Sequence, residues 1–206
     1  MKVKVIIYIL FLTFYSCSSQ SINESDLTFK NNLWYSNNSL FSGEVYQMVR
    51  KEKKILGKLY KGIKEEFWVE FGSLIWREGF YINGNKNGNW NGFYVDSTKA
   101  FSGDYKDDLK VGLWNGWSKK GSLIYKGEYI EGKKNNRWVY YYENGQVSDS
   151  GEYKNDLIKG NWKYYFENGS LMKEGAYNSN GQEISKWSYY NADGTLKEEK
   201  EFEVKE

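Results

Sequence analysis

The chain contains no histidine and no proline, and it has a single cysteine, Cys17, among its 206 residues. Without histidine, the sequence lacks the usual general base and the commonest neutral metal ligand, and no serine or cysteine can pair with a histidine for nucleophilic catalysis. One cysteine excludes a disulfide within the chain. The absence of proline is typical of a chain whose backbone N–H groups are nearly all used in strand ladders.

Carboxylates remain as candidate catalytic groups, because paired acids can hydrolyse glycosides. Glu143 and Glu167 recur at one position of a repeat, but both adjoin turns, where a solvated acid is expected. The chain has no Gly-x-Ser-x-Gly elbow, and its acids lack the spacing of a calcium loop. We therefore expect a protein that is not an enzyme and that needs neither a metal ion nor a cofactor.

The composition is polar but rich in rings. Aromatic residues make up 19% of the chain, with 9 Trp and 19 Tyr, while the mean hydropathy is -0.77. Lys and Arg number 29, and Asp and Glu number 27. Removal of residues 1–16, which contain two lysines and no acid, would leave 27 of each. A neutral chain argues against a nucleic-acid partner, for which a basic face is expected.

The first sixteen residues differ from the rest of the chain. Lys2 and Lys4 precede an apolar stretch, VIIYILFLTFY, that is too short to cross a bilayer and is typical of a secretory signal. Cys17 follows, and the junction resembles the lipobox of bacterial lipoproteins, in which the cysteine becomes the lipidated N-terminus. Phe14 and Tyr15 depart from that pattern, which usually has a leucine and a small residue there. Cleavage nearby by ordinary signal peptidase is the alternative.

We predict three segments from these features. Residues 1–16 form a lipoprotein signal peptide, residues 17–32 form a polar, pattern-free tether behind the lipid anchor, and residues 33–206 form one repeat domain. The lipoprotein resemblance implies a location in the bacterial cell envelope, on the periplasmic or outer-membrane side. The lipid anchor is the only membrane contact that we expect.

A repeat of about 24 residues is the dominant signal in the chain. Its tryptophans are Trp90, Trp114, Trp138, Trp162 and Trp187, and its glycines are Gly79, Gly103, Gly127, Gly151 and Gly175, each followed by a tyrosine two residues on. An earlier unit contains Gly57 and Trp68, and LFSGEVYQ from Leu40 is similar to a degenerate half-unit. We expect the repeated tryptophans and glycines to be structural.

Each unit has the pattern of a β-hairpin. Asn144-Gly145 and Asn168-Gly169 are preferred pairs for a two-residue type I′ turn, and Asp193-Gly194 is the next best. Pairs such as Asn83-Gly84 and Glu131-Gly132 supply the turns between units. The sequence therefore predicts an all-β fold, an elongated single-layer antiparallel meander of tandem hairpins.

The turn register predicts which side chains share a face of the sheet. Trp162 should lie beside Gly175, where a large ring fills the gap that glycine leaves. On the other face Lys163 should lie beside Glu174 as a favourable cross-strand pair.

A second set of rings stands three residues after each repeat tryptophan, on the opposite face. Its members are Phe71, Phe93, Trp117, Tyr141, Tyr165 and Tyr190. In a meander, these rings form a file across the sheet. In one interpretation the file only covers the backbone of a thin sheet. In the other it is an exposed aromatic track that binds a partner.

The repeat resembles a known family. YKGEYIEGKKNNRW, residues 125–138, resembles the MORN repeat, with Tyr, Gly and aromatic positions in the same order. GNWKYYFENGSLMKEGAYNSNG, residues 160–181, is similar to the bacterial variant found in proteins labelled YwqK-type antitoxins. The resemblance covers residues 34–202, and it implies an elongated antiparallel sheet with interaction roles. RWVYYYENGQV, residues 137–147, is also similar to choline-binding cell-wall hairpins, but the second Gly-Trp of those repeats is missing after the turn.

Three functions remain open. A cell-envelope scaffold or protein-binding module is favoured, because repeat sheets offer long surfaces and few pockets. A glycan or peptidoglycan binder is the second, since rings in a row can stack on sugar faces, and a lipid-contacting module is the third. The family label adds an antitoxin-like neutraliser of a partner, although an exported protein does not meet a cytoplasmic toxin.

Overall fold

The computed structural model describes residues 20–203, so Cys17 and the predicted signal peptide lie outside the described residues. The elements of the described part are β1 (Ser21–Asn23), the 3₁₀ turn η1 (Glu24–Asp26), β2 (Thr28–Lys30), β3 (Leu33–Ser36), β4 (Ser39–Leu40), β5 (Gly43–Val49), β6 (Glu52–Tyr60), β7 (Ile63–Glu70), β8 (Ile75–Ile82), β9 (Asn85–Tyr94), β10 (Lys99–Lys106), β11 (Leu109–Trp117), β12 (Leu123–Ile130), β13 (Lys133–Tyr141), β14 (Val147–Lys154), β15 (Leu157–Tyr165), β16 (Leu171–Tyr177), β17 (Glu183–Tyr190) and β18 (Leu196–Phe202).

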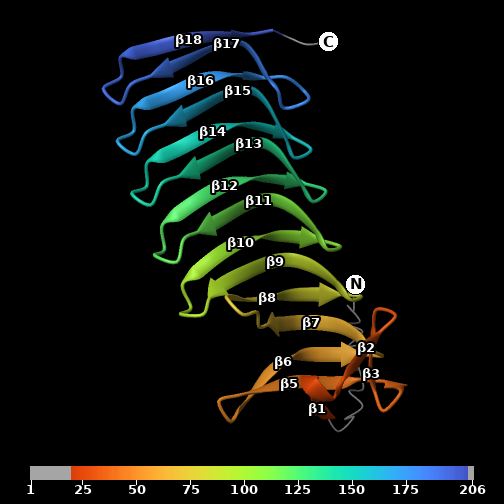
Figure 1. Ribbon diagram of the computed structural model, residues 1–206. Coiled ribbons are helices and arrows are strands. Elements are labelled where there is room, and N and C mark those ends of the chain that lie inside the picture. Colours follow the sequence, from red (N-terminus) through yellow and green to blue (C-terminus); the bar gives the residue numbers. More distant parts are fainter. Residues whose placement is uncertain (1–19, 204–206) are drawn as a thin grey trace, which may run out of the picture.

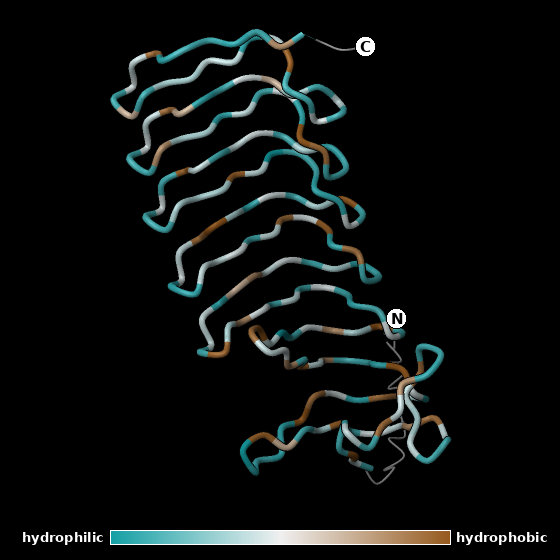
Figure 2. Tube along the Cα trace, viewed as in Figure 1, coloured by the Kyte–Doolittle hydropathy of each residue, from teal (hydrophilic) through white to brown (hydrophobic). Residues whose placement is uncertain are grey.

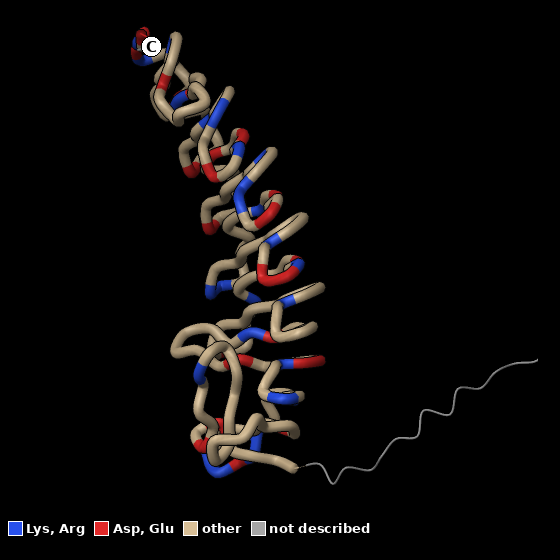
Figure 3. The backbone as a smooth tube through the Cα atoms, turned by 90° about the vertical axis from the view of Figure 1, so that its right-hand side faces the viewer, with Lys and Arg blue, Asp and Glu red and all other residues tan. Residues whose placement is uncertain are grey.

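Fifteen strands form one long sheet, in which β1 is followed by β5 to β18 in sequence order. From β5 onward each strand pairs antiparallel with the next, which confirms the predicted meander of hairpins (Figure 1). Seen from its side, the sheet is a narrow band along which basic and acidic residues are interspersed (Figure 3). Hydrophobic residues occur in short stretches separated by hydrophilic ones (Figure 2), as expected for a sheet with little aliphatic core.

Five of the turns along one side of the sheet are two-residue loops in which both residues have positive φ. They are Lys61-Gly62, Asn83-Gly84, Asp107-Asp108, Glu131-Gly132 and Asn155-Asp156. Positive φ at both positions is what a type I′ turn requires, and its twist matches that of the flanking strands. The turns predicted between units are therefore confirmed.

The Asn-Gly turns on the other side differ from the prediction of a two-residue type I′ turn. The Gly169 N–H donates to the Phe166 carbonyl at 2.8 Å, and the Phe166 N–H donates to the Ser170 carbonyl at 2.9 Å. Gly169 has φ +83, while Asn168 is outside the positive-φ set. The loop thus contains three residues, with a glycine in the left-handed region after the turn, which shifts the register near the loop by one residue.

A bulge precedes every repeat tryptophan. The residue two positions before it has a positive φ in each unit: Glu66, Gly88, Gly112, Asn136, Gly160 and Ser185. In β15 the four-residue step from Lys159 to Lys163 lies opposite the two-residue step from Ser150 to Glu152. The extra residues bend the strand next to the tryptophan. This bulge was not part of the predicted hairpin.

The last connection between units is longer than the others. The Asn178 N–H donates to the Gln182 carbonyl at 2.9 Å, and the Gly181 N–H donates to the Asn178 carbonyl at 3.1 Å. This loop replaces a two-residue turn between β16 and β17. The additional length is the reason why Trp187 follows Trp162 after 25 residues instead of 24.

The segment predicted to be a pattern-free tether differs from that prediction within the described residues. β1 pairs in parallel with β5, from Ser21 beside Glu44 to Asn23 beside Tyr46. β2 joins β3 and β4 in a small second sheet. Ile22 and Leu27 pack against the buried cluster, and this burial orders a segment whose apolar residues are too few to show a period.

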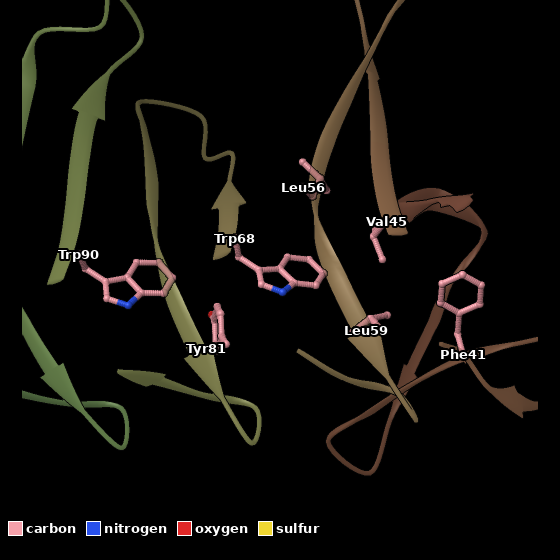
Figure 4. Packing of buried hydrophobic residues seen from close by; sticks show 7 residues of the cluster. All are labelled: Phe41, Val45, Leu56, Leu59, Trp68, Tyr81 and Trp90. Carbon is pink, nitrogen blue, oxygen red and sulfur yellow. The ribbon is translucent and has the colours of Figure 1, made fainter. Parts of the chain in front are cut away.

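The N-terminal end of the sheet has an aliphatic cap. Val45 lies opposite Gly57, as Trp68 lies opposite Gly79, so the valine takes the position of a tryptophan in the degenerate half-unit. Val45 is fully buried with Phe41, Leu56 and Leu59 against Trp68 (Figure 4). Terminal repeats commonly depart from the consensus in this way, because they must close the core of the array.

Candidate functional site: two faces of one sheet

One face of the sheet, here called the tryptophan face, is filled by an alternating ladder of rings. The ladder runs Trp68, Tyr81, Trp90, Tyr105, Trp114, Tyr129, Trp138, Tyr153, Trp162, Tyr177 and Trp187, with neighbouring ring centroids 5.1 to 6.5 Å apart and the planes near perpendicular. Tyr81 lies between Trp68 and Trp90 (Figure 4). Each tryptophan is at most 3% exposed. Edge-to-face packing of aromatic rings adds to the stability that burial of their surface area alone provides.

Each tryptophan is held by a glycine and a carbonyl on the preceding strand. Trp162 lies opposite Gly175 along the backbone, as predicted, but its ring covers Gly151, where an added Cβ would come within 2.3 Å of the indole. The Trp162 Nε1–H donates to the Glu152 carbonyl at 3.1 Å. The same arrangement repeats for the other five tryptophans. The backbone register of Trp162 opposite Gly175 is as predicted, but the prediction that the Trp162 ring fills the gap at Gly175 is wrong, because the ring covers Gly151 on the preceding strand.

Lysines cover the ladder in the first four full units. Lys64, Lys86, Lys110 and Lys134 place their ammonium groups 4.3 to 4.6 Å from a tryptophan ring centroid. Each also lies 4.8 to 5.5 Å from the next tyrosine ring. Burial lowers the pKa of Lys86, Lys110 and Lys134. Cation–π contacts of partly desolvated lysines stabilise the packing.

The first unit also contains a charged cluster around Glu70. Its carboxylate lies 2.7 Å from the Lys64 ammonium, 2.7 Å from the Arg77 guanidinium and 3.3 Å from the Lys86 ammonium, and it accepts a 2.5 Å hydrogen bond from the Tyr81 hydroxyl. Burial alone would raise the pKa of Glu70, but the hydrogen bonds and charges of these partners outweigh it and hold the pKa well below its usual range. The cluster links β7, β8 and β9 through the side chains of the first units of the ladder.

The six rings predicted to form a file lie at two-strand intervals, about 10 Å apart. Tyr190 donates to the Glu174 carboxylate at 3.2 Å, beside the predicted Lys163–Glu174 ion pair of 3.0 Å. Lysines cover two of the others, Lys99 at 5.2 Å from the Trp117 centroid and Lys126 at 5.7 Å from Tyr141. No ring pair among residues 20–203 joins two members of this set. The six rings of this set are thus separated from one another rather than stacked in a continuous file.

Two neighbouring groups of rings lie on the opposite face, in β7, β8 and β9 and just after β7. We call Phe67, Phe71, Trp76, Phe80 and Phe93 the aromatic patch. Trp76 stacks on Phe93 with centroids 4.3 Å apart, Phe71 lies 6.5 Å from Trp76, and Phe67 meets Phe80 edge-to-face at 5.5 Å. Phe67, Phe71 and Phe80 remain 43%, 49% and 53% exposed.

The predicted set contained only Phe71 and Phe93 from this patch and missed the other three rings. A signal for one of them was present in the repeat. Phe80 follows Gly79 directly, whereas acids, Asp104, Glu128 and Glu152, hold the same position in the next three units. Phe80 thus departs from the acids of the three units that follow it, and this difference marks the opposite face of its unit as a distinct surface.

A hollow of about 500 Å³ lies where the small sheet meets the first units. Phe29 and Trp34, whose ring centroids are 4.8 Å apart, line it together with Lys64, Asn83 and Asp108. Phe29 is 56% exposed. The size suits a small ligand, and the lining combines rings with amide and carboxylate groups.

Two further searches of the described residues complete the site description. In residues 20–203, no three side chains among His, Cys, Asp and Glu are grouped so that they could hold a metal ion. Over the same range, the structure contains no helix long and apolar enough to span a membrane.

Comparison with known proteins gives little to add to this geometry. No protein-family model matches the chain, and no curated protein matches it. Among solved structures, a mutant of S. aureus TarM in complex with fondaparinux, alpha-GlcNAc-glycerol and UDP matches 47% of the chain with a TM-score of 0.32, and a second TarM structure matches 48% with 0.31, both at 14% identity. The chain spans 19% of the length of each TarM structure. Likeness at this level carries no argument about fold or function.

Proposed function

We propose that the protein is a non-enzymatic binding module of the cell envelope, a lipoprotein with MORN-like repeats that presents one face of its sheet to a protein partner. The aromatic patch carries this proposal. Its three exposed phenylalanines lie on a sheet whose other face is already filled by the chain's own rings. Exposed clusters of large apolar side chains mark protein-interaction surfaces, where aromatic anchors dominate the binding energy.

The charge and shape of the sheet support the same reading. In the view of Figure 3, basic and acidic residues are interspersed along residues 20–203, a distribution that does not favour a polyanionic ligand. A long single-layer sheet also presents an extended surface rather than a deep cleft, which suits a partner of similar size.

A site-specific photocrosslink tests this proposal in cells. With a photoreactive residue at Phe80, the full chain should give a discrete protein adduct, and Phe67→Ala in the same chain should reduce it. The same probe at Leu157, which is 50% exposed and lies in β15, is the matched control. Equal adducts from both positions, or none from Phe80, would reject the patch as the binding surface.

Lipidation of Cys17 is the second element of the proposal, and it rests on the sequence of the signal junction. An alkyne fatty acid supplied to cells should label the wild type and not Cys17→Ser. Label retained by the variant would refute the anchor while leaving the binding face intact.

The hollow beside Phe29 and Trp34 favours one alternative function, glycan binding. Two rings next to Asn83 and Asp108 offer a stacking surface and hydrogen-bonding groups for a sugar. Retention on isolated peptidoglycan should then fall in Phe29→Ala and stay unchanged in Phe67→Ala. The reverse order would favour the aromatic patch instead.

A further inference from the structure

The two edges of the long sheet are of different kinds. At the N-terminal edge the three-residue strand β1 pairs with β5, and the small sheet is hydrogen-bonded alongside through Trp34 N–H to the Gly62 carbonyl at 2.9 Å. At the C-terminal edge, β18 pairs with β17 through six of its seven residues, Lys197 lies at a register shift, and within residues 20–203 no strand pairs with its other side. The unused backbone groups of β18 form a template for another strand.

The side chains of β18 restrict which strand can pair with it. The strand reads Leu-Lys-Glu-Glu-Lys-Glu-Phe from residue 196 to 202, and all but the last residue are exposed. Charges on an edge strand normally prevent pairing with arbitrary strands. They permit pairing with a strand of complementary charge, because opposite charges across a ladder attract and like charges repel.

The strand is complementary to itself when reversed. In an antiparallel pair of two copies centred on Glu199, Lys197 lies opposite Glu201 of the second copy, and Glu198 lies opposite Lys200 of the second copy. Two-fold symmetry repeats both contacts, so the pairing contains four attractive pairs.

The single like-charge contact lies at the centre, and it is already compensated within each copy. Glu199 is 2.6 Å from the Lys186 ammonium and 3.4 Å from the Ser188 hydroxyl. The two central carboxylates would therefore meet with a lysine beside each, which reduces their repulsion.

Other registers lose this match. Residues opposite each other in an antiparallel two-fold pair must share a face of the sheet, so the register can shift only in steps of two. One such shift sets Lys200 against its own copy and Glu199 against Glu201. The other leaves Glu198 against its own copy and keeps only the contacts between Lys197 and Glu199. The register centred on Glu199 is thus the most favourable of the three.

We propose that two copies of the chain associate through antiparallel pairing of β18, centred on Glu199, to form one continuous sheet. The two-fold axis is then perpendicular to the sheet, so the tryptophan faces are continuous. Both aromatic patches lie on the same side of the dimer, near its two far ends. Seven residues make a small interface, and the association should accordingly be weak and dependent on concentration.

Sedimentation of the full chain across a range of concentrations tests the pairing. The parent should shift from monomer to dimer, and the shift should weaken with added salt. Lys200→Glu turns two attractive contacts into repulsive ones. The dissociation constant of the variant dimer should therefore be at least about tenfold higher than that of the parent dimer. Lys154→Glu, an exposed charge change on β14, is the matched control and should dimerise as the parent does.

A charge-exchange experiment separates the register from a general effect of charge. Lys197→Glu with Lys200→Glu makes an acidic edge, and Glu198→Lys with Glu201→Lys makes a basic one. Each double variant should be monomeric alone, because its own contacts repel, and an equal mixture should restore dimers with the parental number of attractive contacts. Circular dichroism of each variant confirms that the sheet is retained.

Three outcomes would overturn the proposal. They are a parent chain that stays monomeric at all accessible concentrations, variants that associate as the parent does, and open-ended assemblies larger than a dimer. The last would indicate head-to-tail contact between different edges instead of a two-fold pair.

Discussion

The two faces of this sheet are built from the same strands but differ in how their rings are held. On the tryptophan face, each repeat tryptophan is enclosed by a glycine, a carbonyl and a perpendicular neighbouring ring, and Trp138 and Trp162 are each 1% exposed. On the opposite face, the rings of the predicted file are separated from one another, and three phenylalanines of the aromatic patch remain about half exposed, as Phe80 does at 53%. The difference teaches that aromatic content alone does not identify a binding surface. Rings that pack against one another and are buried stabilise the fold, whereas exposed rings are available to a partner.

Truncation on the tryptophan face should give the largest effect. Trp162→Ala removes a buried ring that contacts Tyr153 and Tyr177 and leaves a cavity that a single-layer sheet cannot fill. The free energy of unfolding should fall by about 3–5 kcal/mol. Urea denaturation followed by circular dichroism measures it, and a loss below about 1 kcal/mol would show that the ladder is not the core.

The Glu70 cluster should give the next largest effect, and it should depend on pH. Because the pKa of Glu70 is depressed in the folded chain, its stabilisation is present above the unfolded pKa of about 4.3 and is lost as the pH falls below that value. At pH 7, Glu70→Gln should cost about 2–3 kcal/mol, since it leaves a cationic group with a weaker acceptor.

Denaturation at several pH values between about 7 and 2 checks this prediction. The difference in stability between parent and Glu70→Gln should shrink toward acid pH. A constant difference would mean that the carboxylate charge is not what stabilises the cluster. Glu167→Gln, an exposed acid in a turn, serves as a control with little expected effect.

A methyl group on the covered glycine should cost less than the loss of the ring. In Gly151→Ala the new Cβ would come within 2.3 Å of the Trp162 indole, so the ring must move, at a cost of about 1–3 kcal/mol. Gly160→Ala is the matched control in the same unit, since its Cβ meets nothing within 4 Å but its φ of +62 disfavours a side chain. Its cost should be about 1 kcal/mol. Thermal melts of both variants separate crowding from backbone strain.

Truncation on the opposite face should give the smallest effect. Tyr165→Ala removes a ring from a partly exposed position, so the loss of stability should be about 1 kcal/mol. Phe67→Ala should likewise stay folded while partner crosslinking falls. Equal losses of stability from Tyr165→Ala and from Trp162→Ala would show that both faces are core.

Much of this fold follows from the sequence, because the period is carried by residues with one clear physical role each. The spacing of Trp162 from Gly175, and of Lys163 from Glu174, predicts the strand register that the structure shows. The turns between units were predicted for the same reason, since pairs such as Asn83-Gly84 adopt positive φ at low cost.

The remaining features depend on contacts or on signals that were not used. The loop at Gly169 has one more residue than an Asn-Gly pair alone predicts, because a type I turn with a following glycine competes with type I′. The bulges were signalled by glycines inside strands, such as Gly88 and Gly160. The order of residues 21–30 arises from packing of Ile22 and Leu27 on the cap, which no local pattern reveals. The aromatic patch required a comparison between units.

One pair of variants on a single strand tests the central distinction most directly. Trp138 and Tyr141 lie three residues apart in β13 and occupy opposite faces, so the same backbone serves as its own control. We predict that Trp138→Ala lowers the free energy of unfolding by about 3–5 kcal/mol and Tyr141→Ala by about 1 kcal/mol, as measured by urea denaturation under identical conditions. Equal losses from the two variants, or a larger loss from Tyr141→Ala, would contradict the assignment of the tryptophan face as the core.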